Sequence, residues 1–396
     1  MANVRPFRAT RYAREQIDAL LSPPYDAAEA EVIQRLRASE PLNSAALDAS
    51  NSPEESASLW RNWRESGVLI DEAEPAIYLY EGASESGVTM RGIFAAVPVG
   101  AYGPGTGVYG HERTLDGPRA GRLALLAATR ANLSPILLLR AGGAKGFGIA
   151  FAEVAAGQPA TRATAPDGTR IQLWQVAPES EAGRSLLDWA SGAALIIADG
   201  HHRYEAAREY AERYGGPVAT MGLIVEAETA GPTLHATHRI LRGYKSERFM
   251  NALRESSGVL EAQPINLADA AERFSEAHRG ELTEFALCAN GAANLITLAP
   301  SQEAQPITQR VEDLLRSLLG ISKEDIAAGA LRYERRVADA VEASRTEGVI
   351  TLLLPPERAE LVTSMALAQQ VMPQKATHFS PKPATGLLFL SHDQNA

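Results

Sequence analysis

The richest group of chemically useful side chains is residues 199–203, with the sequence Asp-Gly-His-His-Arg. The preceding residues, 194–198, form a continuous apolar run of the length expected for a buried strand. Residues 204–214 then repeat tyrosine and alanine at helical spacing. The pattern predicts a strand-to-helix turn. The unpaired N–H groups and the dipole of such a helix start favour an anion such as phosphate.

Each residue of this turn has a predicted role. Gly200 lets the backbone approach a phosphate closely, and Arg203 can hold phosphate oxygens through two N–H groups. Asp199 can orient a histidine or bind Mg²⁺, while His201 and His202 can donate to phosphate or transfer protons. The alternative is that Asp199 caps the helix and the two histidines lie on the surface.

A second group follows a glycine-rich loop at residues 100–110. Glu112 could act as a general base, or it could share a metal site with His111. The helix predicted next carries Arg119 and Arg122, which are further candidates for binding a substrate or an anion. For His111 and Glu112, a pair of solvated loop residues is the alternative.

A third candidate is Asp26, which follows Pro23 and Pro24. Because the two prolines fix φ and exclude helix, they predict a rigid turn that holds this carboxylate in place. A carboxylate placed in this way suits a base that deprotonates a hydroxyl group. The alternative is that it caps the helix that follows. Asp26 and Glu112 are therefore two candidates for one catalytic base.

The C-terminal tail contributes the basic residues Lys375, His378 and Lys382. In an extended chain His378, Ser380 and Lys382 share one face, because side chains alternate with a period of two. This face is predicted to bind an anion, and a solvated edge strand is the alternative. Two further candidates for an anion site lie at His238 and Arg239.

The chain resembles a bacterial family catalogued as domain of unknown function 1015. The resemblance rests on motifs spread over nearly the full length: Ser22-Pro23-Pro24-Tyr25-Asp26, His111-Glu112-Arg113-Thr114, residues 197–204, Thr237-His238-Arg239 and Met372-Pro373-Gln374-Lys375. The turn at residues 199–204 also resembles the ParB/sulfiredoxin-like superfamily and its free-serine kinases. The superfamily resemblance implies that this turn binds nucleotide phosphates and that a carboxylate base lies on an N-terminal segment.

These observations predict a phosphoryl-transfer enzyme, a kinase or phosphatase, that acts on a small hydroxy compound. The resemblance favours free serine or phosphoserine as the substrate. We expect Mg²⁺ near Asp199 and a nucleotide or pyrophosphate as the phosphate donor. One alternative is a nucleotide-binding regulatory protein. The other is a metal-dependent hydrolase or nuclease whose ligands would be His111, Glu112, Asp199, His201 and His202.

Composition limits the partners and the compartment. The formal net charge of −10 argues against a nucleic-acid or anionic-membrane binder. No apolar run approaches the roughly 20 residues of a membrane span, and residues 1–14 lack the apolar stretch of a signal peptide. We therefore expect a cytoplasmic protein with a small-molecule substrate and a phosphate-containing ligand.

The predicted fold is α/β or α+β, with a mixed sheet that contains the ParB/sulfiredoxin-like element. Residues 1–243 are predicted to form an α/β catalytic core, and residues 244–345 a charged, helix-rich accessory unit. Residues 346–396 are expected to pack back on the core. Within the core, a strand pair is predicted at residues 149–154 and 171–176.

Overall fold

The computed structural model describes residues 1–85, 87–112, 114, 116–142, 146–215, 219–226, 231–276, 278, 282–301, 305–322, 325–326, 329–373 and 375–394. Two motif residues named above, Arg113 and Gln374, lie outside the described residues. The chain forms two compact units. Unit 1 comprises residues 1–233, 366–370 and 381–396, and unit 2 comprises residues 234–365 and 371–380.

This division corrects the predicted domain boundaries. The chain leaves unit 1 after Thr233 rather than after residue 243, and residues 346–365 belong to unit 2 rather than to a segment on the core. The reason is sheet pairing: strand β18 (Val349–Leu353) lies between β15 and β13 in the sheet of unit 2. Such pairing joins segments distant in sequence, and composition along the chain does not reveal it.

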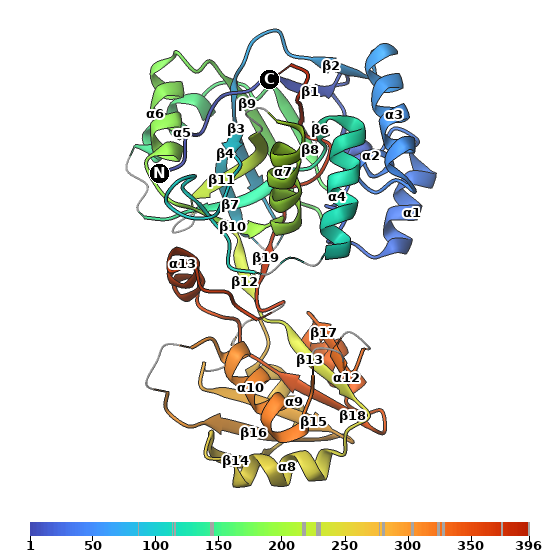
Figure 1. Ribbon diagram of the computed structural model, residues 1–396, viewed down its shortest axis with the longest axis vertical. Coiled ribbons are helices and arrows are strands. Elements are labelled where there is room, and N and C mark those ends of the chain that lie inside the picture. The colour runs from blue at the N-terminus through green and yellow to red at the C-terminus, as the bar shows by residue number, and fades with distance from the viewer. Residues whose placement is uncertain are drawn as a thin grey trace. The chain divides into compact units, whose positions relative to one another are not determined.

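Unit 1 is built on an eight-stranded sheet in the order β5-β10-β7-β11-β4-β3-β9-β8 (Figure 1). The pairs β5/β10 and β7/β11 are parallel and the other neighbours are antiparallel, which confirms the predicted mixed α/β class. The strands are β3 (Ile77–Ala83), β4 (Thr89–Pro98), β5 (Val108–Tyr109), β7 (Ile136–Arg140), β8 (Thr161–Thr164), β9 (Arg170–Val176), β10 (Leu195–Asp199) and β11 (Ala219–Glu226). The apolar strand β10 is second from the edge of the sheet, because the short β5 pairs beyond it.

A smaller sheet joins the two ends of the chain. Its order is β2-β1-β20-β6, and β1 pairs antiparallel with both β2 and β20. The Phe389 ring lies 5.9 Å from the ring of Tyr12 and 5.6 Å from that of Trp60. The last residues of the chain thus complete an aromatic core begun by the first. The strands are β1 (Ala9–Tyr12), β2 (Leu69–Asp71), β6 (Ala131–Asn132) and β20 (Phe389–Ser391).

Helices cover the main sheet of unit 1. Helices α5 and α6 lie together, with the rings of Phe147 and Trp189 stacked at 4.3 Å, and α4 packs against α7 through Leu123 and Ala207 (Figure 1). The predicted strand at residues 149–154 is wrong, because this apolar run lies in α5; an apolar run alone does not distinguish a buried strand from a buried helix. The helices are α1 (Ala30–Ser39), α2 (Ala45–Asp48), α3 (Pro53–Glu65), α4 (Asp116–Thr129), α5 (Phe147–Ala155), α6 (Glu181–Ser191) and α7 (His201–Tyr214), with a 3₁₀ turn at Asp18–Leu20.

Unit 2 is built on a six-stranded antiparallel sheet in the order β14-β16-β15-β18-β13-β17. The prediction of a mainly helical unit is therefore corrected. The polar sequence did not indicate a sheet, because strands such as β14 expose most of their side chains and therefore lack the apolar pattern of a buried strand. The strands are β13 (His238–Arg242), β14 (Val259–Ile265), β15 (Glu284–Ala289), β16 (Ala292–Leu298), β17 (Leu331–Glu334) and β18.

Helices and a two-stranded sheet complete unit 2. Phe249 and Leu253 of α8 and Val311 of α10 pack into one core with the large sheet. The helices are α8 (Ser246–Glu255), α9 (Leu267–Arg273), α10 (Ile307–Leu319) and α12 (Val337–Ala343), and the two-stranded sheet pairs β12 (Thr233–His235) with β19 (His378–Ser380). Helix α13 (Ala359–Leu367) is divided between the units: its residues up to Met365 belong to unit 2, and those from Ala366 belong to unit 1. Among the described residues, no helix has both the length and the apolar character to cross a membrane.

Candidate functional site

Two parallel strands bring His111 and His201 together. Val108 of β5 pairs with Leu195 of β10, so the residues that follow the two strands leave the sheet at the same edge. The backbone N–H of His111 donates to Nε2 of His201 at 3.3 Å, and the ring centroids are 4.7 Å apart with the planes nearly perpendicular. Both histidines are buried, so neither is a surface residue. These two histidines, 90 residues apart in the sequence, are thus in contact.

Burial controls the charge of His111. It lowers the pKa of this imidazole from 6.5 to about 4, and a contact with the backbone of Ile197 offsets the effect only in part. The imidazole of His111 is therefore neutral at pH 7. Because His201 accepts a hydrogen bond at Nε2, a neutral His201 carries its proton on Nδ1. Glu112 follows His111 in sequence and is half-buried, and His202 is half-buried at the start of α7.

Only glycine fits position 200. Its φ is +96°, and an added Cβ would lie 2.8 Å from Cγ2 of Ile136 and 3.1 Å from Cζ of Arg203. Gly200 is the N-cap of α7 and, having no side chain, supplies no cap to this helix, whose first turn contains no acidic residue. Helices α3 and α6 are instead capped by Ser52 and Ser180. The first N–H groups of α7 are thus the kind of donors that bind anions.

The alternative readings as helix caps are both wrong. Asp199 is the last residue of β10, and its carboxylate contacts the side chains of Arg203 and Lys382 rather than the α7 backbone. Asp26 does not cap a helix either, because α1 begins at Ala30 with Glu29 as its N-cap. Both carboxylates instead face cationic side chains, which gives them an electrostatic role.

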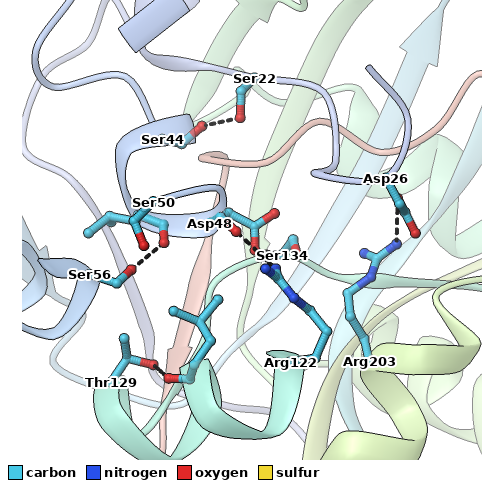
Figure 2. A network of polar contacts seen from close by, with 12 residues as sticks. Ser22, Asp26, Ser44, Asp48, Ser50, Ser56, Arg122, Thr129, Ser134 and Arg203 are labelled. Atoms are coloured by element: carbon cyan, nitrogen blue, oxygen red, sulfur yellow. Dashed lines mark hydrogen bonds and ion pairs between the residues drawn. The ribbon is translucent and has the colours of Figure 1, made fainter. Parts of the chain in front are cut away.

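Arg203 is buried, and Figure 2 shows its guanidinium pointing toward Asp26. Its Nη1 donates to the carbonyl of Pro135, and its Nη2 lies 2.5 Å from Oδ2 of Asp199 and 3.9 Å from Oδ1 of Asp26. Burial by itself lowers the pKa of Arg203, but the charges of Asp26, Asp199 and Asp48 more than offset it, so the net shift is upward. The structure therefore corrects the expectation of a guanidinium open to phosphate, because both ends of the fork already have protein partners.

Lys382 reaches the same turn from the C-terminal tail. Its Nζ contacts Oδ1 of Asp199, and both side chains are largely buried. Burial alone raises the pKa of Asp199, but Lys382 and Arg203 lower it well below its ordinary value. The carboxylate is thus ionised, with one oxygen on each cation. A Mg²⁺ ion at these oxygens would face two positive groups, so Asp199 does not fit the predicted role of magnesium ligand in this arrangement.

The turn that follows the two prolines packs on a second arginine. Tyr25 stacks on Arg122, whose Cζ lies 3.7 Å from the ring centroid. Nη1 of Arg122 donates to the backbone oxygen of Asp48 at 2.9 Å and to its Oδ1 at 3.1 Å, and Ser134 Oγ also donates to Oδ1 at 3.1 Å (Figure 2). Arg122 is therefore a structural residue rather than an open anion binder. Its stacking fixes Tyr25, and with it the neighbouring Asp26.

Asp48 and Ser134 are the two residues of this network that the sequence analysis missed. Neither belongs to a motif with recognisable chemistry, and neither the end of the short helix α2, where Asp48 lies, nor the loop position of Ser134 gives a signal of burial. Together with Arg122 and Arg203 they line a cavity of about 30 Å³, which holds a water or two but no substrate. Within the described residues, Oδ2 of Asp48 and Nε of Arg203 have no hydrogen-bond partner. Both polar atoms are consistent with an ordered water at this position.

The predicted residues of the tail and of the 237–239 motif are divided between the units. Lys382 belongs to unit 1, whereas Lys375 and His378 belong to unit 2, so the predicted strand face of His378, Ser380 and Lys382 does not form. Strand β19 ends at Ser380, before Lys382. His378 packs against His235, with ring centroids 5.8 Å apart, and Lys375 is exposed.

The remaining predicted residues have structural partners. His238 Nδ1 accepts the N–H of Leu354 at 3.2 Å. Arg239 is fully buried and bonds the carbonyl of Thr237 and, at 3.4 Å, Glu312, so it is not an open anion binder. The remaining candidate, Arg119, forms ion pairs with Asp116 at 3.1 Å and Glu209 at 3.5 Å.

The metal-site alternative requires several ligands around one ion. In the described part of the chain, no group of three or more His, Cys, Asp or Glu side chains is placed to hold one metal ion. All the ligands considered for that alternative fall within this part of the chain: His111, Glu112, Asp199, His201 and His202.

The fold and this site define a mixed α/β protein in which a helix starts after a glycine, beside buried charge pairs. The chain matches the family described as "Protein of unknown function (DUF1015)" over residues 4–318, and it belongs to that family. The family resemblance noted in the sequence is thus confirmed. No curated protein matches the chain.

Three solved structures show what the fold is similar to. A mutant free serine kinase in complex with ADP has a TM-score of 0.38 and 15% identity over 69% of this chain and 84% of its own. SbnI with C-terminal truncation, from Staphylococcus aureus, has a TM-score of 0.40 and 10% identity, and the match covers 74% of this chain and 85% of SbnI. A conserved hypothetical protein from Pyrococcus furiosus has a TM-score of 0.37 and 14% identity, and the match covers 75% of this chain and 99% of that protein.

Proposed function

We propose that this protein is a phosphoryl-transfer enzyme that acts on a small hydroxy compound. The observation that carries the proposal is the start of α7, which follows Gly200, contains no acidic residue in its first turn and has Lys382 at the same turn. Helix N–H groups and a lysine ammonium both bind phosphate oxygens. The turn at residues 199–204 resembles the phosphate-binding turn of free-serine kinases, and for this reason free serine and phosphoserine are the first substrates to test.

In this proposal the first-turn N–H groups of α7 and the ammonium of Lys382 hold the phosphate. Arg203 is a positioning residue, because it fixes Asp199 and thereby the place of Lys382. His201 can donate from Nδ1, since its Nε2 accepts from His111. A nucleotide or pyrophosphate supplies the phosphoryl group, and phosphoryl transfer depends mainly on such positioning and charge stabilisation.

Asp26 is the favoured base of the proposal. Its carboxylate is 28% exposed and lies 3.9 Å from Arg203 Nη2, so it can accept a proton while it remains electrostatically held. In the kinase direction it takes the proton of the substrate hydroxyl. The hydroxyl oxygen then bonds to phosphorus as the bond from phosphorus to the leaving oxygen breaks. In the phosphatase direction water takes the place of the hydroxyl compound. Glu112 is the alternative base.

Ligand binding is the first test. ATP, ADP, AMP, pyrophosphate, serine and phosphoserine, with and without Mg²⁺, are screened by thermal shift, since a ligand of the native state raises Tm by mass action. The best ligand is then titrated against Lys382→Ala and, as a matched control from the same tail, Lys375→Ala. We expect Lys382→Ala to weaken binding about ten- to a hundredfold. Equal binding by both variants, or no shift with any phosphate compound, contradicts the proposed site.

Turnover separates the two bases. Serine with the donor found in the screen, and phosphoserine alone, are followed by phosphorus NMR. Loss of a general base lowers turnover about 10²–10⁴-fold, and we expect this loss for Asp26→Asn with ligand binding kept. Glu112→Gln is the comparison: if it loses turnover while Asp26→Asn does not, Glu112 is the base. Binding without turnover by the parent protein would favour the regulatory alternative.

A further inference from the structure

Unit 2 contains a second arrangement of reactive side chains, separate from the phosphate site. His235 ends β12 and Ser380 ends β19, and these two strands form a small sheet. His235 Nε2 lies 2.6 Å from Ser380 Oγ, and its Nδ1 lies 3.0 Å from Oε1 of Glu276. A serine hydroxyl, an imidazole and a carboxylate are therefore linked in series.

The order of these groups is the one that activates a serine. A neutral imidazole that donates from Nδ1 to a carboxylate has its lone pair on Nε2, where it accepts the hydroxyl proton. An imidazole held in this tautomer by a carboxylate can act as general base for a serine nucleophile. The side chain of His235 is 18% exposed, so this imidazole is partly shielded but reachable.

A cavity adjoins the linked side chains of Ser380, His235 and Glu276, which together form a relay. It has a volume of about 350 Å³, within the range of small-molecule sites, and both His235 and Glu276 belong to its wall. Much of the remaining wall is apolar, and includes Leu234, Phe274, Val337 and Pro356. An imidazole and a carboxylate at the edge of a mainly apolar cavity suit a ligand that has an apolar group next to a polar reacting centre.

We infer that Ser380 is a nucleophile that cleaves small esters with an apolar acyl group. Its Oγ attacks the ester carbonyl carbon while His235 Nε2 takes the hydroxyl proton. The bond between the carbonyl carbon and the alcohol oxygen then breaks, and the alcohol leaves with that proton. Water attacks the acyl-serine, with His235 again taking the proton, and releases the acid and free Ser380. Glu276 is a positioning residue that holds the imidazole tautomer.

A fluorophosphonate probe with an alkyl chain tests the nucleophile without knowledge of the natural ester. The full-length native protein is incubated with the probe, and adducts are counted by intact mass and located by peptide mapping. We expect one adduct, on Ser380, that forms faster than any adduct of urea-denatured protein. Ser380→Ala should abolish it, whereas Ser275→Ala, at the wall of the same cavity, should keep it.

The proposal also requires that His235 acts as the general base and that Glu276 positions it. His235→Ala should slow adduct formation about 100-fold or more, as expected for loss of a general base. His278→Ala is the control, since this histidine is exposed and outside the relay. Glu276→Gln should slow the reaction less than His235→Ala and change its pH profile, whereas Glu272→Gln should do neither. Circular dichroism verifies that each variant is folded.

The inference is overturned if native protein gains no adduct faster than denatured protein. Labelling that survives Ser380→Ala, or that is unchanged in His235→Ala, overturns it as well. All residues of this site belong to unit 2, whereas the proposed phosphate site belongs to unit 1. Labelling of Lys382→Ala at the parent rate would show that the two sites are independent, and either proposal can fail without the other.

Discussion

Replacing Arg203 with alanine should destabilise unit 1 strongly. The guanidinium is buried, bonds the carbonyl of Pro135 and pairs with Asp199. Its loss leaves a buried carbonyl without its donor and a buried carboxylate with one cation, Lys382, instead of two. Removing one partner of a buried ion pair costs about 3–5 kcal/mol. Arg203→Lys restores the charge without the planar fork, so we expect it to recover only part of this loss.

Tryptophan fluorescence is the appropriate measurement. All tryptophans of the chain, at positions 60, 63, 174 and 189, lie in unit 1, so urea unfolding followed by their emission reports this unit. With a urea m-value of about 3 kcal/mol/M, the expected loss lowers the midpoint by about 1–2 M. Arg213→Ala is the matched control on the same helix: its pair with Glu209 is at the surface and should contribute at most about 0.5 kcal/mol.

The result that refutes this reasoning is a clear one. If Arg203→Ala unfolds at the same midpoint as Arg213→Ala with an unchanged m-value, then Arg203 does not hold the network together. In that case its guanidinium would be free to serve a ligand, as the sequence had suggested. A lowered midpoint combined with restored stability on addition of the best phosphate ligand would instead show that structural and binding roles meet at this turn.

Three further predictions concern the same region. Gly200→Ala should destabilise unit 1 by about 1–3 kcal/mol from backbone strain, and by more than Gly215→Ala, because Gly215 has a φ of +73° but open space around it. Folding lowers the pKa of His111 from 6.5 to about 4, so the free energy of unfolding decreases as the pH falls through this range. In urea titrations at pH 7, 5.5 and 4, His111→Gln should reduce that decrease by roughly 3 kcal/mol. The pKa of Asp199 is lowered below 3.8 in the folded protein, so the contribution of this carboxylate to the free energy of unfolding is complete above about pH 4 and is lost below it. Asp199→Asn should therefore be less stable than the parent at pH 7 and should lack this acid-dependent loss of stability.

Local sequence determined the strand-to-helix turn and its neighbours. The apolar run of β10, Gly200 and the helical repeat of α7 are all read from adjacent residues, because strand burial, positive φ and helix periodicity are local properties. The helix that carries Arg119 and Arg122, α4, was predicted for the same reason. The motifs spread along the chain also identified the family correctly.

Only the tertiary structure decided what the charged residues do. Arg203 reads as a ligand-binding side chain in sequence, but Pro135, 68 residues away, makes it a buried structural residue. Asp48 and Ser134 gave no local signal, because the contacts of Asp48 with Arg122 and Ser134 join residues that are far apart in the sequence.

The tail shows the same limit. Its alternating pattern predicted one face for His378 and Lys382, but these residues belong to different units. The physical reason is that a side chain's partners are set by long-range pairing of strands and packing of helices. Composition and periodicity record only whether a residue can be buried or charged, and the fold decides which charges meet.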